Sequence, residues 1–493
     1  MTTPMTDATA RPMPQSPSPA DGNSIVKVIF ASAAGTMIEW YDFYLFALIG
    51  TVVAPQFYQS TTELGAVISW LATFAVGFIV RPFGAIVFGR LGDLVGRKYT
   101  FLVTMTIMGL CTFAIGLLPT RATVGDFAGV LLISLRILQG LALGGEYGGA
   151  ATYIAEHAPH GKRGAYTSWI QTTATLGLLV GLIVVLITRT ALGERNFASY
   201  GWRIPFLASA VLIAVSLYIR LSLKESPLFS KLKSENALSK NPITESFGNW
   251  FNLRYVLLAL FGATMGQGVV WYTGQFYALF YLTSIFKVPL VTAYTIMGVA
   301  VLLGTPFFVV FGSLSDKIGR KRIMLTGMFL AVLTYIPIYW AIGNAVGPIT
   351  PAVLDDAGKV LTAAFATSPN VPLLIALVFI QVIYVTLVYS PIAAFLVELF
   401  PTKIRYTSMS LPYHIGNGVF GGLVPVFGLI LIQAATDPKA VSWLTPLVKP
   451  MGHYAGLLYP MIVASVCFVV GVFLLPETNG IDVQAGDSTA GNQ

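Results

Sequence analysis

Three ionisable residues lie inside long apolar stretches of the sequence. Glu39 and Asp42 stand three positions apart in the stretch 27–54, and Arg136 lies in the stretch 125–155. Residues three apart share one face of a helix, so both carboxyl groups point the same way. A rise of about 1.5 Å per residue places all three at similar depths, near the middle of a membrane. Ionisable groups at that depth are expected to serve a function.

These residue types permit more than one chemistry. A carboxyl group held between an apolar cavity and an arginine can bind a proton on one side of a membrane and release it on the other. Glu39, Asp42 and Arg136 are therefore the candidates for proton coupling, and the sequence leaves open which acid titrates. A static ion pair that joins two helices is the alternative. The forked guanidinium of Arg136 could also bind a substrate carboxylate through two hydrogen bonds.

The elements that position these residues are predicted to be transmembrane helices. The chain has 493 residues, of which 55% are hydrophobic and 10% charged, whereas soluble domains carry about 25% charged residues. Backbone groups must all be paired in lipid, and apolar runs of about 20 residues without a period of two favour helices over a barrel. The twelve predicted spans are 27–54, 64–89, 98–118, 125–155, 164–188, 202–222, 254–284, 290–314, 321–342, 371–398, 405–433 and 453–475.

Two motifs occur twice, in the same order. Gly-x-Leu-x-Asp-x-x-Gly-Arg-Lys occupies 89–98 and 312–321, and Glu-x-x-Pro-x-x-x-Arg occupies 156–163 and 398–405. Such repetition indicates a duplicated unit. The predicted parts are a disordered cytoplasmic N-terminus (1–26), a six-helix bundle (27–222), a cytoplasmic linker (223–253), a second six-helix bundle (254–475) with an extended outside loop (343–370), and a cytoplasmic tail (476–493). We expect that loop to be partly helical around Leu354–Ala366, and its role is open.

The positive charges predict the orientation. Most of the 29 lysines and arginines fall on the side of the spans that holds the N-terminus, which the positive-inside rule assigns to the cytoplasm together with the C-terminus. Acids and bases of both repeated motifs converge on that face, where they form a candidate cytoplasmic gate; a role in topology alone is the alternative. The gate residues are Asp93, Arg97, Glu156 and Arg163 in the first half and Asp316, Arg320, Glu398 and Arg405 in the second.

The twelve spans, the duplication and the Asp-containing loop motif resemble the major facilitator superfamily. Four further motifs are similar to its metabolite–proton symporter branch, which includes shikimate, α-ketoglutarate, citrate and proline/betaine permeases. They are Ile38-Glu-Trp-Tyr-Asp-Phe-Tyr, Arg81-Pro-Phe-Gly, Arg136-x-x-Gln-Gly-x-x-x-Gly-Gly-Glu146 and Gly201-Trp-Arg-Ile-Pro-Phe206. The short tail lacks the coiled coil of the osmosensing members, and the fifth span lacks the Gly-Pro of drug antiporters.

The resemblance implies secondary active transport by alternating access, with a site near the bilayer midplane. It implies proton-coupled uptake of a small organic acid across the inner membrane, with the charged patch latching the cytoplasmic side. A facilitator or exchanger without proton coupling is the alternative. We expect no enzyme activity and no cofactor. We also expect no metal, because His157 and His160 have no further metal-binding partners in the sequence. The expected partners are a carboxylate-bearing small molecule, protons and lipid, without nucleic acid, and the protein is expected to be a monomer.

The second half supplies the remaining substrate-binding candidates. Besides Arg136, they are Trp271, Tyr272, Gln275, Tyr384, His414 and Asn417. Packing is the alternative for each of them, and for His414 it is the expected one. We also expect Arg81 to pair with Glu146, and the glycines from Gly140 to Gly149 to let helices approach closely.

Overall fold

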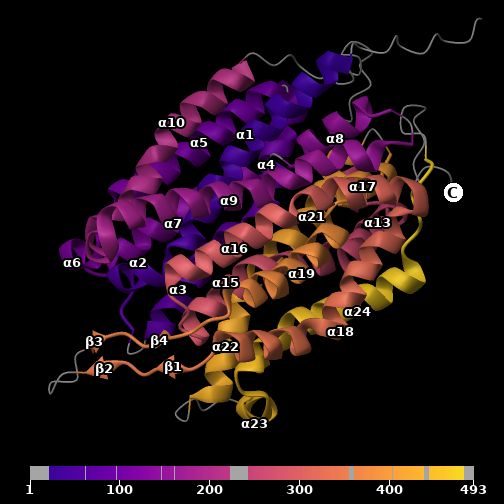
Figure 1. Ribbon diagram of the computed structural model, residues 1–493. Coiled ribbons are helices and arrows are strands. Elements are labelled where there is room, and N and C mark those ends of the chain that lie inside the picture. Colours follow the sequence, from indigo (N-terminus) through magenta and orange to yellow (C-terminus); the bar gives the residue numbers. More distant parts are fainter. Residues whose placement is uncertain are drawn as a thin grey trace, which may run out of the picture.

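The computed structural model describes residues 22–60, 63–95, 97–145, 147–159, 161–221, 242–354, 360–401, 404–437 and 443–481. Long helices that run side by side make up most of the molecule (Figure 1). In the described part of the chain, nine helices are long and apolar enough to cross a membrane, and a bent pair makes a tenth. Two shorter apolar helices, Leu102–Leu117 and Arg203–Val215, occupy the positions of predicted spans 3 and 6. The predicted all-helical membrane fold is confirmed.

The helices of the first half of the chain, residues 22–221, pack against one another. Its elements are α1 (Gly22–Leu48), α2 (Gly50–Phe57), α3 (Glu63–Ile79), α4 (Arg81–Val95), α5 (Arg97–Leu117), α6 (Arg121–Val124), α7 (Phe127–Gly144), α8 (Tyr147–His157), α9 (Arg163–Asn196), η1 (Phe197–Gly201) and α10 (Arg203–Leu221).

The second half, residues 242–481, follows the same plan with more irregular helices. Its helical elements are α12 (Pro242–Phe247), α13 (Trp250–Ala259), η2 (Leu260–Thr264), α14 (Met265–Tyr272), η3 (Thr273–Tyr277), α15 (Ala278–Phe280), η4 (Tyr281–Ile285), α16 (Leu290–Gly304), α17 (Pro306–Ile318), α18 (Arg320–Val346), α19 (Val371–Tyr389), α20 (Ile392–Leu399), α21 (Arg405–Tyr413), η5 (His414–Phe420), α22 (Val424–Thr436), α23 (Thr445–Val448), η6 (Lys449–Leu457) and α24 (Leu458–Leu474).

Two spans of the first half depart from a regular helix. The helix pair Gly35–Leu48 and Gly50–Phe57 is bent by 66°. The second predicted span is irregular at Val80, where α3 ends and Arg81 and Pro82 begin α4, but it remains one span, Gly65–Phe88. Proline has no N–H to donate, so one helical hydrogen bond is missing at this point, while the N–H groups of Phe83 and Gly84 both reach the carbonyl oxygen of Val80. Arg81 therefore lies in the middle of a span.

Helix α7 packs closely against α3 and α4 on both sides of Val80. A Cβ atom at Gly140 would overlap the carbonyl oxygen of Gly77, and one at Gly144 would overlap that of Arg81. Only glycine allows the two backbones to approach so closely. The predicted role of this glycine row is confirmed at both positions.

The loop between α18 and α19 is a β-hairpin rather than the expected helix. Strand β1 (Ile349–Thr350) pairs antiparallel with β4 (Phe365–Ala366), and β2 (Val353–Leu354) pairs with β3 (Val360–Thr362). The hairpin extends beyond the ends of the helices (Figure 1). The expectation of a helix was wrong because β-branched and aromatic residues of this loop, such as Val360 and Phe365, favour extended backbone. Residues 355–359 lie outside the described part.

Candidate functional site

A small cavity of about 20 Å³ lies between the two halves of the chain. Its walls come from α1, α4, α7, α8 and α9 of the first half and from α21 and η5 of the second. The lining residues are Thr36, Glu39, Trp40, Arg81, Leu143, Tyr147, Ala150, Ile170, Tyr413 and His414. A site between the halves of a duplicated transporter is where the substrate is expected.

The two acids of α1 are buried in the interior, and one of them lines the cavity. Glu39 is in the cavity wall and its exposed fraction is 3%. Asp42 lies one turn further along α1 with an exposed fraction of 2%. Its Oδ1 atom accepts no hydrogen bond from the described residues. The structure therefore places both predicted proton-coupling acids inside the bundle, at and beside the cavity.

Arg136 is buried away from the cavity and is hydrogen-bonded. Its Nη1 atom donates to Oε1 of Gln139 over 2.7 Å, and Nε2 of Gln139 donates to Oγ1 of Thr112 over 2.7 Å. Its guanidinium carbon lies 4.2 Å from the ring centroid of Phe43. Among the described residues no ion pair joins Arg136 to Asp42. Arg136 is also not among the residues that line the cavity, and its role as a partner of the acids of α1 stays a prediction.

Arg81 is the permanently charged residue that does line the cavity, and the sequence analysis did not select it as a site residue. Its guanidinium carbon lies 4.0 Å from the ring centroid of Phe78, 4.4 Å from that of Phe43 and 5.3 Å from that of Trp40. Its Nε and Nη2 atoms are buried and have no hydrogen-bond partner within the described ranges. The sequence did contain an indication of this role, since an arginine directly before a proline inside an apolar stretch marks a charge at an irregular point of a helix. Its expected partner Glu146 lies outside the described residues.

His414 is the predicted substrate-binding residue that lines this cavity. Neither of its ring nitrogens has a hydrogen-bond partner in the described part of the chain. Asn417 lies one turn further on, where it accepts from Nε2 of Gln267 over 3.1 Å and donates to the hydroxyl of Tyr413 over 3.3 Å. Tyr384 is elsewhere in the second half, where its hydroxyl accepts from Thr334 over 2.9 Å.

Three of the other predicted substrate residues lie beyond the cavity, towards the end of the molecule that carries the β-hairpin. Trp271 stacks on Tyr44 of the first half with ring centroids 5.3 Å apart, and Tyr272 meets the edge of Phe78 at 5.2 Å. Gln275 is buried on the following turn. In this conformation the rings form an aromatic layer that joins the halves on this side of the cavity.

A second aromatic contact joins the halves at the opposite side of the cavity. The rings of Tyr147 and Tyr413 are parallel, with centroids 3.5 Å apart. Nε2 of Gln171 donates to the hydroxyl of Tyr147 and to the carbonyl oxygen of Tyr389, over 3.0 and 3.1 Å. Since Gln171 and Tyr389 belong to different halves, these bonds also cross the interface.

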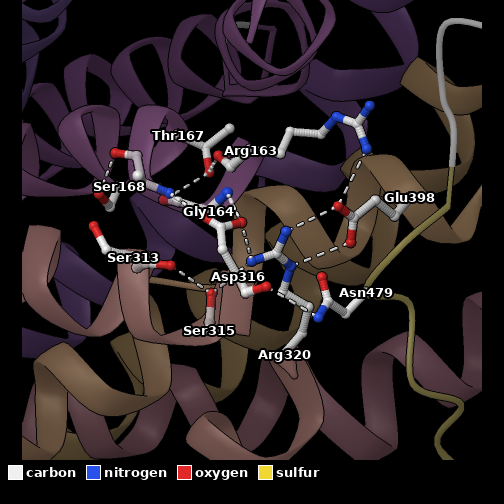
Figure 2. A network of polar contacts seen from close by, with 12 residues as sticks. Arg163, Gly164, Thr167, Ser168, Ser313, Ser315, Asp316, Arg320, Glu398 and Asn479 are labelled. Atoms are coloured by element: carbon white, nitrogen blue, oxygen red, sulfur yellow. Dashed lines mark hydrogen bonds and ion pairs between the residues drawn. The ribbon is translucent and has the colours of Figure 1, made fainter. Parts of the chain in front are cut away.

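Beyond these tyrosines, a charged network that we call the latch ties the halves together (Figure 2). Oε1 of Glu398 accepts from Nη1 of Arg163 over 3.4 Å and from Nη2 of Arg320 over 3.1 Å. All three side chains are buried. Because Arg163 belongs to the first half and the other two to the second, Glu398 links the two halves directly.

Asp316 makes a second link from the same network. Its two carboxylate oxygens accept from the backbone N–H groups of Gly164 and Ala165, over 2.8 and 2.9 Å, and Oδ1 pairs with Arg320 at 2.6 Å. These N–H groups begin α9 of the first half. A carboxylate at a helix N-terminus satisfies free donors and interacts favourably with the helix dipole.

The start of the predicted tail is part of the latch. Glu477 accepts from the backbone N–H of Arg320 over 2.8 Å, and the hydroxyl of Thr478 donates to Oε2 of Glu398 over 2.8 Å. The carbonyl oxygen of Ile481 accepts from Nη1 of Arg163 over 2.8 Å. The sequence analysis treated these residues as a plain polar tail.

The described gate residues of the two copies of the motifs thus meet in one network. Arg163, from the first copy, pairs with Glu398 from the second, and Asp316 of the second copy binds the backbone N–H groups of the two residues after Arg163. Nε of Arg405 donates to the carbonyl oxygen of Phe400 over 3.0 Å, within its own loop. The side chains of Asp93, Arg97 and Glu156 lie outside the described part.

Comparison with known proteins agrees with this architecture. The profile of the family described as sugar (and other) transporters matches residues 27–487, nearly the whole chain. This chain belongs to that family. The transporter is 34% identical over 431 residues to the inner membrane metabolite transport protein YhjE of Escherichia coli (strain K12), covering 86% of this chain and 88% of the relative. It is 30% identical over 440 residues to the alpha-ketoglutarate permease of the same organism, covering 89% and 94%.

The fold also matches solved structures. A partially occluded inward-open conformation of the xylose transporter XylE from E. coli superposes with a TM-score of 0.67 and 15% identity, over 94% of this chain and all of the other. At that identity the match supports the major facilitator fold. The chain is therefore a multi-pass membrane transporter for metabolites, a secondary transporter of the major facilitator type, and not an enzyme.

Proposed function

We propose that this transporter takes up a small organic acid together with protons across the inner membrane. The observation that carries the proposal is the position of Glu39 in the wall of the cavity between the halves, with Asp42 one turn away and both side chains buried. Moving a charged carboxylate out of water is costly, and the neutral carboxylic acid lowers that cost. Proton binding and release at these acids would therefore accompany passage between the two sides.

The contacts between the halves support alternating access. In this conformation the latch joins them at one end and the aromatic layer of Tyr44, Trp271 and Tyr272 joins them on the other side of the cavity. Opening one end at a time would expose the cavity to one side of the membrane. We infer that the latch end, with both chain termini, faces the cytoplasm, and that the protein works as a monomer.

The relatives support the substrate class. The printed name of one relative is alpha-ketoglutarate permease, and that substrate carries carboxylate groups. A cavity lined by Arg81, whose Nε and Nη2 atoms have no hydrogen-bond partner among the described residues, suits such an anion. YhjE is described as an inner membrane protein, which supports the same location here.

The decisive test is uptake by proteoliposomes with a pH gradient. The purified protein is reconstituted, and radiolabelled 2-oxoglutarate, succinate, shikimate, benzoate and betaine are each offered with an alkaline lumen. We expect one of them to accumulate above its outside concentration, and a protonophore to abolish the accumulation. Uptake that only equilibrates, with or without the gradient, would instead indicate a facilitator or exchanger.

The first prediction concerns the two acids. Glu39→Gln and Asp42→Asn are each expected to lower gradient-driven accumulation at least tenfold, because an amide cannot carry the proton. Exchange of internal for external substrate should remain in at least one variant, since exchange needs no net proton movement. The control is Glu194→Gln, an acid paired with Arg189 near the outer end of α9. Full accumulation in both acid variants would refute proton coupling through α1.

A further inference from the structure

We propose that Arg81 binds the carboxylate of the transported substrate, with His414 as a second donor from the opposite half. The inference deepens the proposed function and rests on it only in taking the substrate to be an organic anion. It moves the substrate contact from Arg136, which the sequence analysis favoured, to an arginine that lines the cavity.

The guanidinium of Arg81 is arranged to accept an anion at one edge. The aromatic rings of Trp40, Phe43 and Phe78 lie against it, while the N–H groups of a guanidinium point outward in its own plane. Nε and Nη2, the two nitrogens without partners in the described residues, belong to the same edge. Two parallel N–H groups on one edge match the two oxygens of a carboxylate.

Buried polar groups in native proteins are nearly always hydrogen-bonded, and an exception calls for an explanation. The exposed fraction of Arg81 is 1%, yet that edge is unsatisfied. Arg136, which is equally buried but lies outside the cavity wall, leaves only Nε without a partner among the described residues, since Nη1 donates to Gln139 and Nη2 reaches the carbonyl oxygen of Phe74 at 3.5 Å. A ligand that visits the cavity explains why a whole edge of Arg81, with both Nε and Nη2, has no partner within the described residues.

His414 places a second donor in the same cavity wall, on the other half of the chain. Its two ring nitrogens have no hydrogen-bond partner within the described residues. Arg81 reaches the same element, since a Cβ atom at Gly418 would lie 3.6 Å from Cδ of Arg81. An anion that contacts Arg81 and His414 together would therefore hold the two halves around itself.

The charges in the cavity wall also limit the substrate. Among the lining residues that the structure describes, Arg81 is the one permanent cation and Glu39 the one acid. One carboxylate would neutralise Arg81, whereas a second would lie in the cavity without a cation, and a buried unpaired charge is strongly unfavourable. The remaining walls are largely aromatic and aliphatic, from Trp40, Tyr147, Leu143 and Ile170. The cavity therefore favours a monocarboxylate with a compact, partly apolar body.

Binding without any gradient tests the proposal. The protein is purified in detergent, and its melting temperature is followed while benzoate, shikimate, pyruvate, succinate, citrate or the neutral benzamide is titrated, since a ligand of the folded state raises that temperature. We expect at least one monocarboxylate to raise it at lower concentration than succinate or citrate, and benzamide to have no effect. Equal effects of benzoate and benzamide, or tighter binding of citrate than of every monocarboxylate, would overturn the proposal.

Five variants identify the residue that binds the anion. Arg81→Lys and Arg81→Gln are expected to raise the half-maximal concentration at least tenfold, without lowering the melting temperature of the ligand-free protein. His414→Ala should raise that concentration several-fold. Arg136→Lys should lower the ligand-free melting temperature and leave binding unchanged, and Arg195→Lys, at an exposed position near the end of α9, should change neither.

The reverse pattern would overturn the proposal. If folded Arg81→Lys binds as the wild type does, or if Arg136→Lys loses binding while Arg81→Lys keeps it, Arg81 is not the anion site. Anion binding that depends on Arg81, without gradient-driven accumulation, would refute proton coupling and leave this inference standing. Gradient-driven accumulation that is unchanged in Arg81→Lys would refute this inference and leave proton coupling standing.

Discussion

At the scale of a residue, the carboxylate of Glu398 joins three separate parts of the chain. It accepts from Arg163 of the first half, from Arg320 of the second and from Thr478 after the last helix. An isolated buried charge would be costly, but here two cations and a hydroxyl compensate it. Removing one member of a buried charged group costs more than the pair itself contributes, because the partners remain buried and unpaired.

Glu398→Gln is therefore expected to open the latch. Arg163 and Arg320 would lose a shared carboxylate, at a cost of about 3–5 kcal/mol to the conformation in which the halves are joined at this end. The measurement is maleimide labelling of a cysteine placed at buried Thr167, with Cys111 and Cys467 replaced by alanine. We expect the labelling rate to rise at least tenfold.

The control for that experiment is Glu194→Gln, which removes an acid from the Arg189–Glu194 pair, where Glu194 is exposed. Exposed pairs contribute only about 0–1 kcal/mol, so its labelling rate should match the wild type. A rate in Glu398→Gln that equals the control would mean that the latch does not hold this end closed.

At the scale of an element, the packing of α7 against the second span positions a cavity residue. Gly144 of α7 lies directly against the carbonyl oxygen of Arg81, at the start of α4. Small residues at such crossings let backbones touch, and any side chain there must push them apart. The position of the Arg81 guanidinium is thus set by a neighbouring helix.

Gly144→Leu should therefore displace Arg81, although Gly144 itself is not among the residues that line the cavity. The added side chain would overlap the backbone of Arg81, at a cost of about 1–3 kcal/mol in folding free energy. We expect a lower melting temperature and weaker substrate uptake, both measured on purified protein.

The matched control is Gly298→Leu in α16, where an added Cβ meets only Cδ1 of Leu179, at 3.8 Å. The melting temperature and the substrate uptake of that variant should stay close to those of the wild type. If the two variants behave alike, the contact between α7 and α4 does not position Arg81.

At the scale of the whole molecule, the chain end closes the same latch that joins the halves. Glu477 caps the start of α18, the side chain of Asn479 donates to the carbonyl oxygen of Asp316 over 3.1 Å, and Ile481 accepts from Arg163. Residues that follow the last helix thus contact both halves. The short segment 477–481 is part of the gate rather than an appendage.

Two truncations separate these contacts from the rest of the tail. A chain that ends at Ile481 keeps every contact described above and should label at position 167 and melt as the full chain does. A chain that ends at Pro476 loses them, and we expect faster labelling and a lower melting temperature. Identical behaviour of the two truncated chains would show that segment 477–481 has no part in the latch.

The sequence by itself determined the spans, the duplication and the residues worth testing. The length of an apolar run against the thickness of a bilayer is a local property, so all twelve predicted spans coincide with helices or helix pairs of the structure. The burial of Glu39 and Asp42 follows from the same local pattern. The close packing at the glycines of α7 was also predicted, since small residues at this spacing let two helices approach closely.

Only the tertiary structure decided which charges meet. Spans that are apolar on most faces carry little information on which face turns inward, so Arg81 and Arg136 look alike in sequence and differ in the bundle. Arg163 and Glu398 are 235 positions apart, and no local pattern links them. The hairpin at 349–366 and the return of segment 477–481 to the latch depend likewise on contacts between distant parts of the chain. Helix rotation and packing between the halves set these partners, and both are properties of the folded molecule.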